Sequence, residues 1–120
     1  MKGFILIAVI FFVAGCANDN EKTSIDETTI ETNIDGKELF KSCASCHKPD
    51  KDFTGPALKG SLKRWGGDIK AMYAFIRNPS KSYIENAYAK KLLKKWKLQM
   101  TAFPNLTDAE IDAIMKYCEK

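Results

Sequence analysis

After residue 34, the apolar positions of this chain recur at helical spacing. One stripe has spacings 0, 3, 4 and 7 and consists of Ile69, Met72, Tyr73 and Ile76. A second stripe, near the C-terminus, consists of Ile111, Ile114, Met115 and Cys118. Such spacing places apolar side chains on one face of an α-helix. No convincing alternation of apolar and polar residues indicates a strand, so the pattern predicts an all-α domain.

Capping signals indicate where the first and last helices begin. Asp35 is followed three residues later by Glu38, and Thr107 is followed three residues later by Glu110. Each pair matches a capping box, in which the two residues satisfy free backbone N–H groups at a helix start. We therefore expect one helix after Asp35 and another after Thr107.

Two further helices are expected between these. The first begins near Asp68 and ends near Asn78, because Pro79 disfavours helical geometry in the residue before it. The second begins at Ser82, where Glu85 completes another capping box, and runs into "KKLLKKWK". The whole pattern predicts about four short helices.

The N-terminal segment carries export signals. Lys2 precedes a run of ten apolar residues, Phe4 to Val13, which suits a signal peptide but is shorter than the ~20 residues of a membrane span. The following "VAGC" resembles the lipobox of bacterial lipoproteins, in which the chain is cut before the cysteine and the cysteine is lipidated. An ordinary signal peptide with a chance cysteine is the alternative. We expect residues 1–15 to be a signal peptide, and the exported protein to be lipid-anchored through Cys16 on the periplasmic side of a bacterial membrane.

Charge divides the remainder of the chain into two parts. Residues 17–34 carry five acids and one lysine, for a net charge of −4, and no aromatic residue. Because they bury too little apolar surface to offset chain entropy, we expect residues 16–34 to be lipidated Cys16 followed by a disordered acidic tether. Residues 35–120, the expected folded domain, carry 17 bases and 10 acids, for +7. A basic surface favours nucleic acid, anionic lipid or an acidic protein face.

The segment "CASCH" carries the clearest chemistry. It contains Cys43, Cys46 and His47, the single histidine of the chain. C-x-x-C-H is typical of covalent haem attachment. On one helical turn, Cys43 and Cys46 face the same side and can form thioethers with the two vinyl groups of one porphyrin. His47 then supplies an imidazole nitrogen as an axial ligand of the iron.

Three other interpretations of Cys43, Cys46 and His47 remain open. A thioredoxin-like redox pair uses C-x-x-C but expects a βαβ pattern, which this sequence lacks. A zinc site could recruit Cys118 to Cys43, Cys46 and His47, although Cys118 is far away in sequence. A structural disulfide between Cys43 and Cys46 would leave His47 without a role.

The sixth ligand of a haem iron would come from a methionine. A second histidine is absent, Met1 lies in the leader, and Met72 and Met115 lie on apolar helix faces. Met100 alone lies before a proline-containing loop, so it is the candidate ligand. A thioether favours ferrous iron and raises the reduction potential. The alternative is a core methionine beside an open or lysine-ligated iron.

The segment from residue 35 to residue 120 resembles the class I c-type cytochromes. The segments "GKELFKSCASCH", "TGPAL", "FIRNP" and "MTAFPNLTDAEIDAIMKYC" follow one another in the order of that family. The resemblance implies a small cytochrome c fold around one covalent haem c, with electron transfer as the usual role. The ligand methionine of the family stands where Met100 does. The resemblance also implies that the first and last helices cross, with Gly36 and Phe40 meeting Ile114 and Tyr117.

Further contacts of the haem follow from the same resemblance. In the family, the proline carbonyl of the "GP" pair accepts the N–H of the ligand histidine, which makes Pro56 the candidate acceptor. Trp65 resembles an aromatic donor to a haem propionate. A plain turn proline and simple packing of the indole are the alternatives. Cys118 remains unpaired and is interpreted as a small buried hydrophobe.

These interpretations predict a membrane-tethered monohaem carrier of single electrons rather than an enzyme. The alternatives are a haem-dependent sensor or enzyme with an open iron site, and an electron-entry subunit of a larger oxidoreductase. Redox proteins with an acidic docking face are the expected partners, and nucleic acid is not. Candidate docking residues, which could also form an ordinary solvated helix face, are Lys90, Lys91, Lys94 and Lys97.

Overall fold

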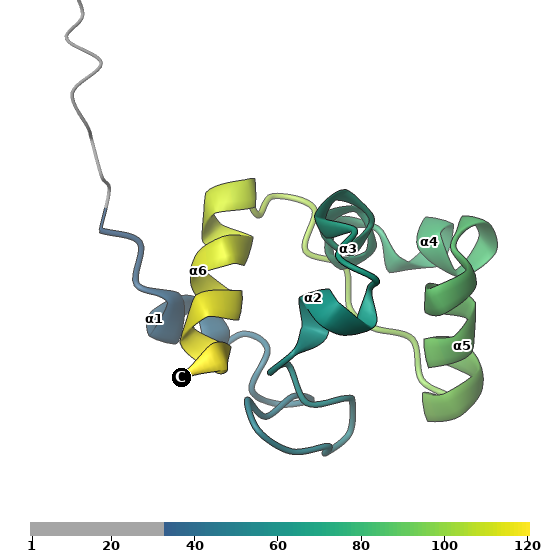
Figure 1. Ribbon diagram of the computed structural model, residues 1–120, viewed down its shortest axis with the longest axis horizontal. Coiled ribbons are helices and arrows are strands. Elements are labelled where there is room, and N and C mark those ends of the chain that lie inside the picture. Colours follow the sequence, from purple (N-terminus) through teal and green to yellow (C-terminus); the bar gives the residue numbers. More distant parts are fainter. Residues whose placement is uncertain (1–32) are drawn as a thin grey trace, which may run out of the picture. The chain divides into compact units, whose positions relative to one another are not determined.

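Six helices follow one another in residues 33–120, the part of the chain that the computed structural model describes (Figure 1). Their bounds are α1 Gly36–Phe40, α2 Ser61–Arg64, α3 Ile69–Arg77, α4 Pro79–Glu85, α5 Ala87–Trp96 and α6 Asp108–Glu119. These residues contain no strand, so the predicted all-α class is confirmed. The predicted signal peptide, lipidated Cys16 and most of the tether lie outside the described residues. Within the described part, no helix is both long and apolar enough to cross a membrane.

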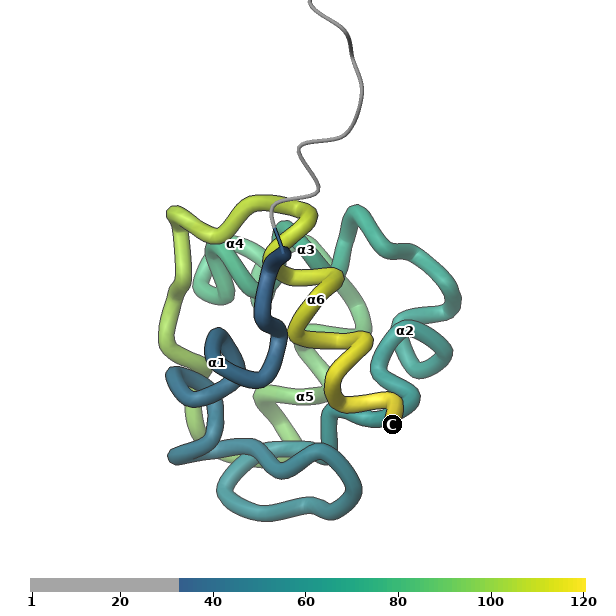
Figure 2. Tube along the Cα trace, turned by 90° about the vertical axis from the view of Figure 1, so that its left-hand side faces the viewer, coloured from purple at the N-terminus to yellow at the C-terminus, as the bar shows by residue number. Residues whose placement is uncertain are grey.

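The first and last helices pack against each other, as the family resemblance implies. In Figures 1 and 2, α1 crosses α6 at one end of the helical unit. The crossing is close because Gly36 has no side chain: a Cβ there would overlap the carbonyl oxygen of Ala113. One turn later, the rings of Phe40 and Tyr117 lie 5.4 Å apart. Phe40, Ile114 and Cys118 form a buried cluster at this crossing.

The predicted capping box is complete at the start of α6 and only half formed at the start of α1. At α6 the capping box is complete: the Glu110 N–H donates to Thr107 Oγ1 at 3.2 Å, and the Thr107 N–H donates to the Glu110 carboxylate at 2.8 Å. At α1 the Asp35 carboxylate accepts from the N–H groups of Lys37 and Glu38. The Glu38 side chain instead pairs with Lys41 at 2.6 Å, so α1 has an N-cap without the reciprocal bond.

Of the two helices predicted in the middle of the chain, the first is present and the second is divided into α4 and α5. Helix α3 has the expected limits, with Asp68 as N-cap and Asn78 as C-cap. Asn78 also caps α4, because Pro79 has the backbone geometry of a first helical residue and needs no N–H partner there. The predicted start at Ser82 is therefore wrong, since Ser82 lies inside α4. A break at Asn86 follows, where the side chain accepts from two N–H groups and begins α5.

The segment after the CASCH motif, where no helix was predicted, contains α2. Two backbone hydrogen bonds join the ends of the loop that precedes α2. The Leu58 N–H donates to the Lys48 carbonyl at 3.1 Å, and the Lys59 N–H donates to the Pro49 carbonyl at 2.8 Å. Gly60 then takes a positive φ of 72° and leads into α2. The prediction of about four helices was too low because α2 is only four residues long and the α4–α5 break depends on a single asparagine.

The apolar stripe of α3 is buried except at its start. Met72, Tyr73 and Ile76 lie in the core beside Ile111 of α6. Ile69, the first residue of the predicted stripe and of α3, is 36% exposed. The stripe prediction was therefore correct for three of its four residues.

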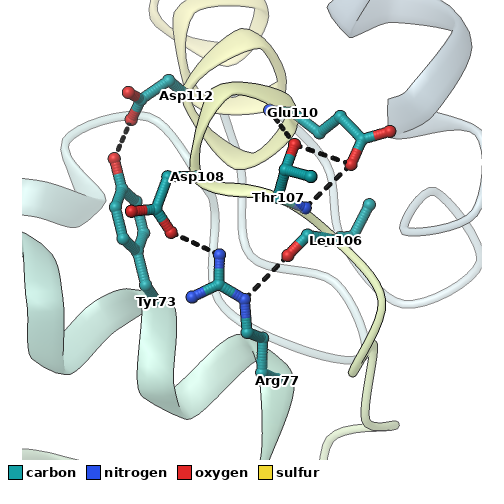
Figure 3. A network of polar contacts seen from close by, with 7 residues as sticks. All are labelled: Tyr73, Arg77, Leu106, Thr107, Asp108, Glu110 and Asp112. Atoms are coloured by element: carbon teal, nitrogen blue, oxygen red, sulfur yellow. Dashed lines mark hydrogen bonds and ion pairs between the residues drawn. The ribbon is translucent and has the colours of Figure 1, made fainter.

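Polar contacts join α3 to the start of α6 (Figure 3). The Arg77 guanidinium donates to the Leu106 carbonyl at 2.7 Å and also to the Asp108 carboxylate. The Tyr73 hydroxyl donates to Asp112, and burial, followed by this carboxylate, raises the pKa of Tyr73 to about 12. These bonds fix the C-terminal end of the segment that connects α5 to α6, which carries Met100.

Candidate cofactor site

The two cysteines and the histidine of the CASCH motif lie on tight turns that continue from α1. The Cys43 N–H donates to the Phe40 carbonyl at 2.8 Å. The Cys43 carbonyl in turn accepts from Cys46 at 3.1 Å and from His47 at 2.9 Å. This local winding brings both thiols and the imidazole to the wall of the same hollow.

That hollow has two adjoining parts, which occupy about 700 Å³ and about 630 Å³ of empty space, including their open mouths. The first part opens beside the CASCH turn, Gly55 and the end of α5. The second part reaches under α2, α3 and α6. The residues that line both parts are Cys43, His47, Pro56, Phe75, Leu92 and Met100. The candidate haem-contacting residues of the sequence analysis, namely Cys43, Cys46, His47, Pro56, Trp65 and Met100, thus all line this largely apolar hollow.

His47 is held in one tautomer by a backbone carbonyl. Its Nδ1 lies 2.8 Å from the carbonyl oxygen of Pro56. A carbonyl only accepts hydrogen bonds, so Nδ1 carries the proton and Nε2 keeps a free lone pair. Gly55 is buried against the ring, and a Cβ at Gly55 would stand 2.6 Å from His47 Cε1. The glycine before Pro56 therefore leaves room for the imidazole.

Met100 lies in the segment between α5 and α6 and is half-buried. Its N–H donates to the hydroxyl of Tyr83, a buried residue of α4, at 3.0 Å. Three residues later, the Phe103 N–H donates to the Ile76 carbonyl at 3.0 Å. These bonds hold the Met100 segment against α3 and α4, with Met100 in the wall of both parts of the cavity.

The two tryptophans occupy different places around the cavity. Trp65 lines the second part and packs between the rings of Phe75, at 5.1 Å, and Tyr88, at 4.9 Å. Trp96 lines the first part, and its Nε1 is the buried side-chain polar atom without a hydrogen-bond partner among residues 33–120. Sequence reasoning did not identify this N–H, because only the three-dimensional contacts reveal that it lacks an acceptor.

These groups fit a covalently attached porphyrin. An apolar cavity offers two thiols, an imidazole with a free Nε2, a thioether and an orphaned N–H donor that suits a carboxylate of the porphyrin edge. The zinc alternative is unsupported, because the described residues contain no cluster of three or more His, Cys, Asp or Glu side chains able to hold a metal.

The redox-pair and disulfide alternatives also find no support. The thiols of Cys43 and Cys46 are free. Burial raises the pKa of the Cys43 thiol, whereas a redox-active pair needs a lowered one. Cys118 is 1% exposed, and burial raises its pKa to about 11. Cys118 is therefore the small buried hydrophobe that the sequence predicted.

Three of the four candidate docking lysines, Lys90, Lys91 and Lys94, lie on α5, and the fourth, Lys97, is its C-cap. Lys90, Lys91, Lys94 and Lys97 are exposed, whereas Leu92, Leu93 and Trp96 are half-buried, so charged and apolar side chains separate around this segment. Helix α5 runs through the "KKLLKKWK" segment as far as Trp96, and Lys97 caps it with a positive φ of 57°. Lys95, not counted among the four, pairs with Asp52 at 3.5 Å.

Comparisons with known proteins agree with this architecture. Residues 34–120 match the model of the cytochrome c family. A solved structure, a cytochrome c from Rhodothermus marinus, superposes with a TM-score of 0.59 at 29% identity, covering 75% of this chain and 78% of that one. Two relatives named cytochrome c2, from Rhodopseudomonas palustris, are 50% and 47% identical over 32 residues, or 27% of this chain. The matched segment spans only 28% of the length of these relatives.

The fold and the cavity define an all-helical domain with room for a covalently held cofactor. Since the family model covers most of the chain, the chain belongs to the cytochrome c family. Membership of this family implies one covalent haem c, and Cys43 and Cys46 have the spacing that its attachment requires.

Proposed function

We propose that this protein carries single electrons by means of one haem c, with His47 and Met100 as the axial ligands of the iron. The observation that carries the proposal is that both residues line both parts of one cavity, whose wall also contains Cys43 and, in its first part, Cys46. When bound, the haem iron supplies the redox chemistry by alternating between the ferric and ferrous states.

The chain contributes orientation and shielding to this role. The Pro56 carbonyl directs the free Nε2 lone pair of His47 toward the ligand position and raises its basicity. The Tyr83 hydroxyl holds the backbone of Met100. The apolar wall, with Phe75 and Leu92, excludes water from the site. Two filled axial positions leave no vacancy for oxygen or peroxide, which favours electron transfer over catalysis.

Carbon monoxide binding separates this proposal from the sensor or enzyme with an open iron site. The reduced wild-type protein should bind carbon monoxide poorly, and Met100→Ala should bind it readily with a lowered midpoint potential. Met115→Leu is the matched control, because Met115 also lines the cavity but lies on α6. Ready binding by the wild-type protein, measured by its absorption spectrum, would decide for an open site.

Covalent attachment has its own test. Cys43→Ala combined with Cys46→Ala should leave haem that acid and organic solvent extract, because no thioether remains. Cys118→Ala should retain the haem, since Cys118 lies in the α1–α6 cluster. Haem that stays bound in the double variant would overturn the assignment of the two cysteines.

We propose further that the haem domain is tethered to the periplasmic side of a bacterial membrane through lipidated Cys16. The support is the "VAGC" segment after a short apolar run. Mass spectrometry of the mature protein should find an acylated Cys16 at its N-terminus, and Cys16→Ser should abolish the modification. An unmodified N-terminus elsewhere would indicate a secreted cytochrome with an ordinary signal peptide.

A further inference from the structure

One peptide group beside the histidine is hydrogen-bonded at both of its polar atoms. The carbonyl oxygen of Pro56 accepts from His47 Nδ1–H at 2.8 Å. The N–H of the same peptide group belongs to Ala57 and donates to Asp52 Oδ1 at 2.9 Å. The Asp52 carboxylate therefore reaches the imidazole through a single polarisable unit.

The Asp52 carboxylate is held in its charged form beside the Ala57 N–H. The hydrogen bond from Ala57 is the main cause that lowers the pKa of Asp52, with smaller effects from Lys95 and Arg64. Lys95 Nζ lies 3.5 Å from the other carboxylate oxygen. Arg64 donates to the Ala57 carbonyl, the next acceptor along the chain, and so holds the same loop. Asp52 thus stays anionic while one of its oxygens accepts from the peptide N–H.

Linked hydrogen bonds polarise one another, by about 10–30% per bond in condensed phase. A carboxylate that accepts the Ala57 N–H draws positive charge toward itself and leaves more electron density on the Pro56 carbonyl. That carbonyl then accepts more strongly from Nδ1–H, which makes Nε2 of His47 a stronger electron donor. A stronger donor stabilises ferric iron relative to ferrous iron and lowers the midpoint potential.

We propose that Asp52 is a positioning residue that strengthens the His47–Pro56 hydrogen bond through the Pro56–Ala57 peptide group and thereby lowers the potential of the iron. Lys95 opposes this effect, because its ammonium group withdraws charge from the Asp52 carboxylate. The inference rests on the proposed role of His47 as an iron ligand. It assigns a tuning function to an exposed loop residue that lies outside the cavity wall.

Two variants of the holoprotein test the proposal by the midpoint potential and by the NMR resonance of His47 Nδ1–H in the ferrous, diamagnetic state. Asp52→Asn keeps an oxygen acceptor for the Ala57 N–H but removes the charge. We expect the potential to rise and the Nδ1–H resonance to move upfield. The control is Asp50→Asn, which removes an equal exposed charge from the same loop, where the described residues give Asp50 no hydrogen bond or ion pair. It should change the potential less and leave the resonance in place.

Lys95→Gln supplies an independent arm that leaves Asp52 intact. We expect its potential to fall and its Nδ1–H resonance to move downfield, beyond the effect of Lys94→Gln on the same helix. Equal potential shifts for each variant and its control, or a shift in potential with an unmoved Nδ1–H resonance, would reduce Asp52 to a distant charge and overturn the inference. A protein without covalent haem, or one whose iron signature survives His47→Ala, would instead refute the proposed function.

Discussion

The buried N–H of the Trp96 indole lacks a hydrogen-bond acceptor in the part of the protein that the structure describes. A buried N–H without an acceptor costs about 1–3 kcal/mol. At the edge of a porphyrin, the groups that accept such a bond are the propionate carboxylates. Trp96 is therefore a second candidate for this contact beside Trp65, whose ring packs against Phe75 and Tyr88.

We expect Trp96→Phe to weaken the hydrogen bonding of one haem propionate. The propionate bending mode in the resonance Raman spectrum should fall in frequency, because that mode follows the strength of hydrogen bonds to the carboxylate. Trp65→Phe is the matched control and should leave the mode unchanged. A shift in the Trp65 variant alone would instead identify Trp65 as the donor.

At the scale of helices, the α1–α6 crossing depends on the absence of a side chain. Gly36→Ala should lower the free energy of unfolding by about 1–3 kcal/mol, the usual cost of overpacking a tight contact, because the added Cβ overlaps the Ala113 carbonyl. Denaturant unfolding of the holoprotein, followed by circular dichroism, measures this. Lys37→Ala, at an exposed position of the same helix, should change the free energy little. Equal stability of the two variants would mean that the helices separate at no cost.

The start of α6 should contribute stability that depends on pH. The backbone N–H and the hydroxyl of Thr107 hold the pKa of Glu110 below its ordinary value of 4.5. Because the folded pKa is the lower one, the stabilisation is present above pH 4.5 and is lost as pH falls through the folded value. The difference in unfolding free energy between wild type and Glu110→Gln should therefore shrink below pH 4.5. A difference that stays constant from pH 7 to strongly acidic solution would contradict this.

At the scale of the whole molecule, we expect the exposed lysines of α5 to create a positive field beside the part of the cavity wall formed by Leu92 and Trp96. Charge reversal of the four docking lysines, Lys90, Lys91, Lys94 and Lys97, to Glu should slow electron exchange with an acidic redox partner at low salt. The effect should diminish as the screening length falls from ~10 Å at 0.1 M salt to ~3 Å at 1 M. Stopped-flow absorbance with membranes from the source organism measures these rates.

A control with the same change in net charge isolates the position of these lysines. It reverses four exposed lysines on other parts of the surface, namely Lys63, Lys70, Lys116 and Lys120. Its rates should stay closer to those of wild type at low salt. Equal slowing of both quadruple variants would show that net charge, rather than the α5 face, governs the association.

Much of this protein followed from local sequence signals. Helical periodicity identified the all-α class, and the Asp68 and Thr107 caps marked helix starts correctly, because capping involves neighbours within a few residues. The C-x-x-C-H spacing indicated the haem for the same reason: the cysteines and the histidine lie on consecutive turns, so their common direction is already determined by the local backbone.

Other features depended on contacts between distant segments. The break at Asn86 and the short α2 escaped prediction, since a lone asparagine and four residues carry weak periodic signals. The orphaned N–H of Trp96 and the link from Asp52 through the Pro56–Ala57 peptide to His47 are likewise invisible in the sequence. Hydrogen-bond partners across a folded loop depend on where the backbone turns. Local pattern therefore determined the class of the protein and its attachment motif, and tertiary packing decided which groups surround the iron site.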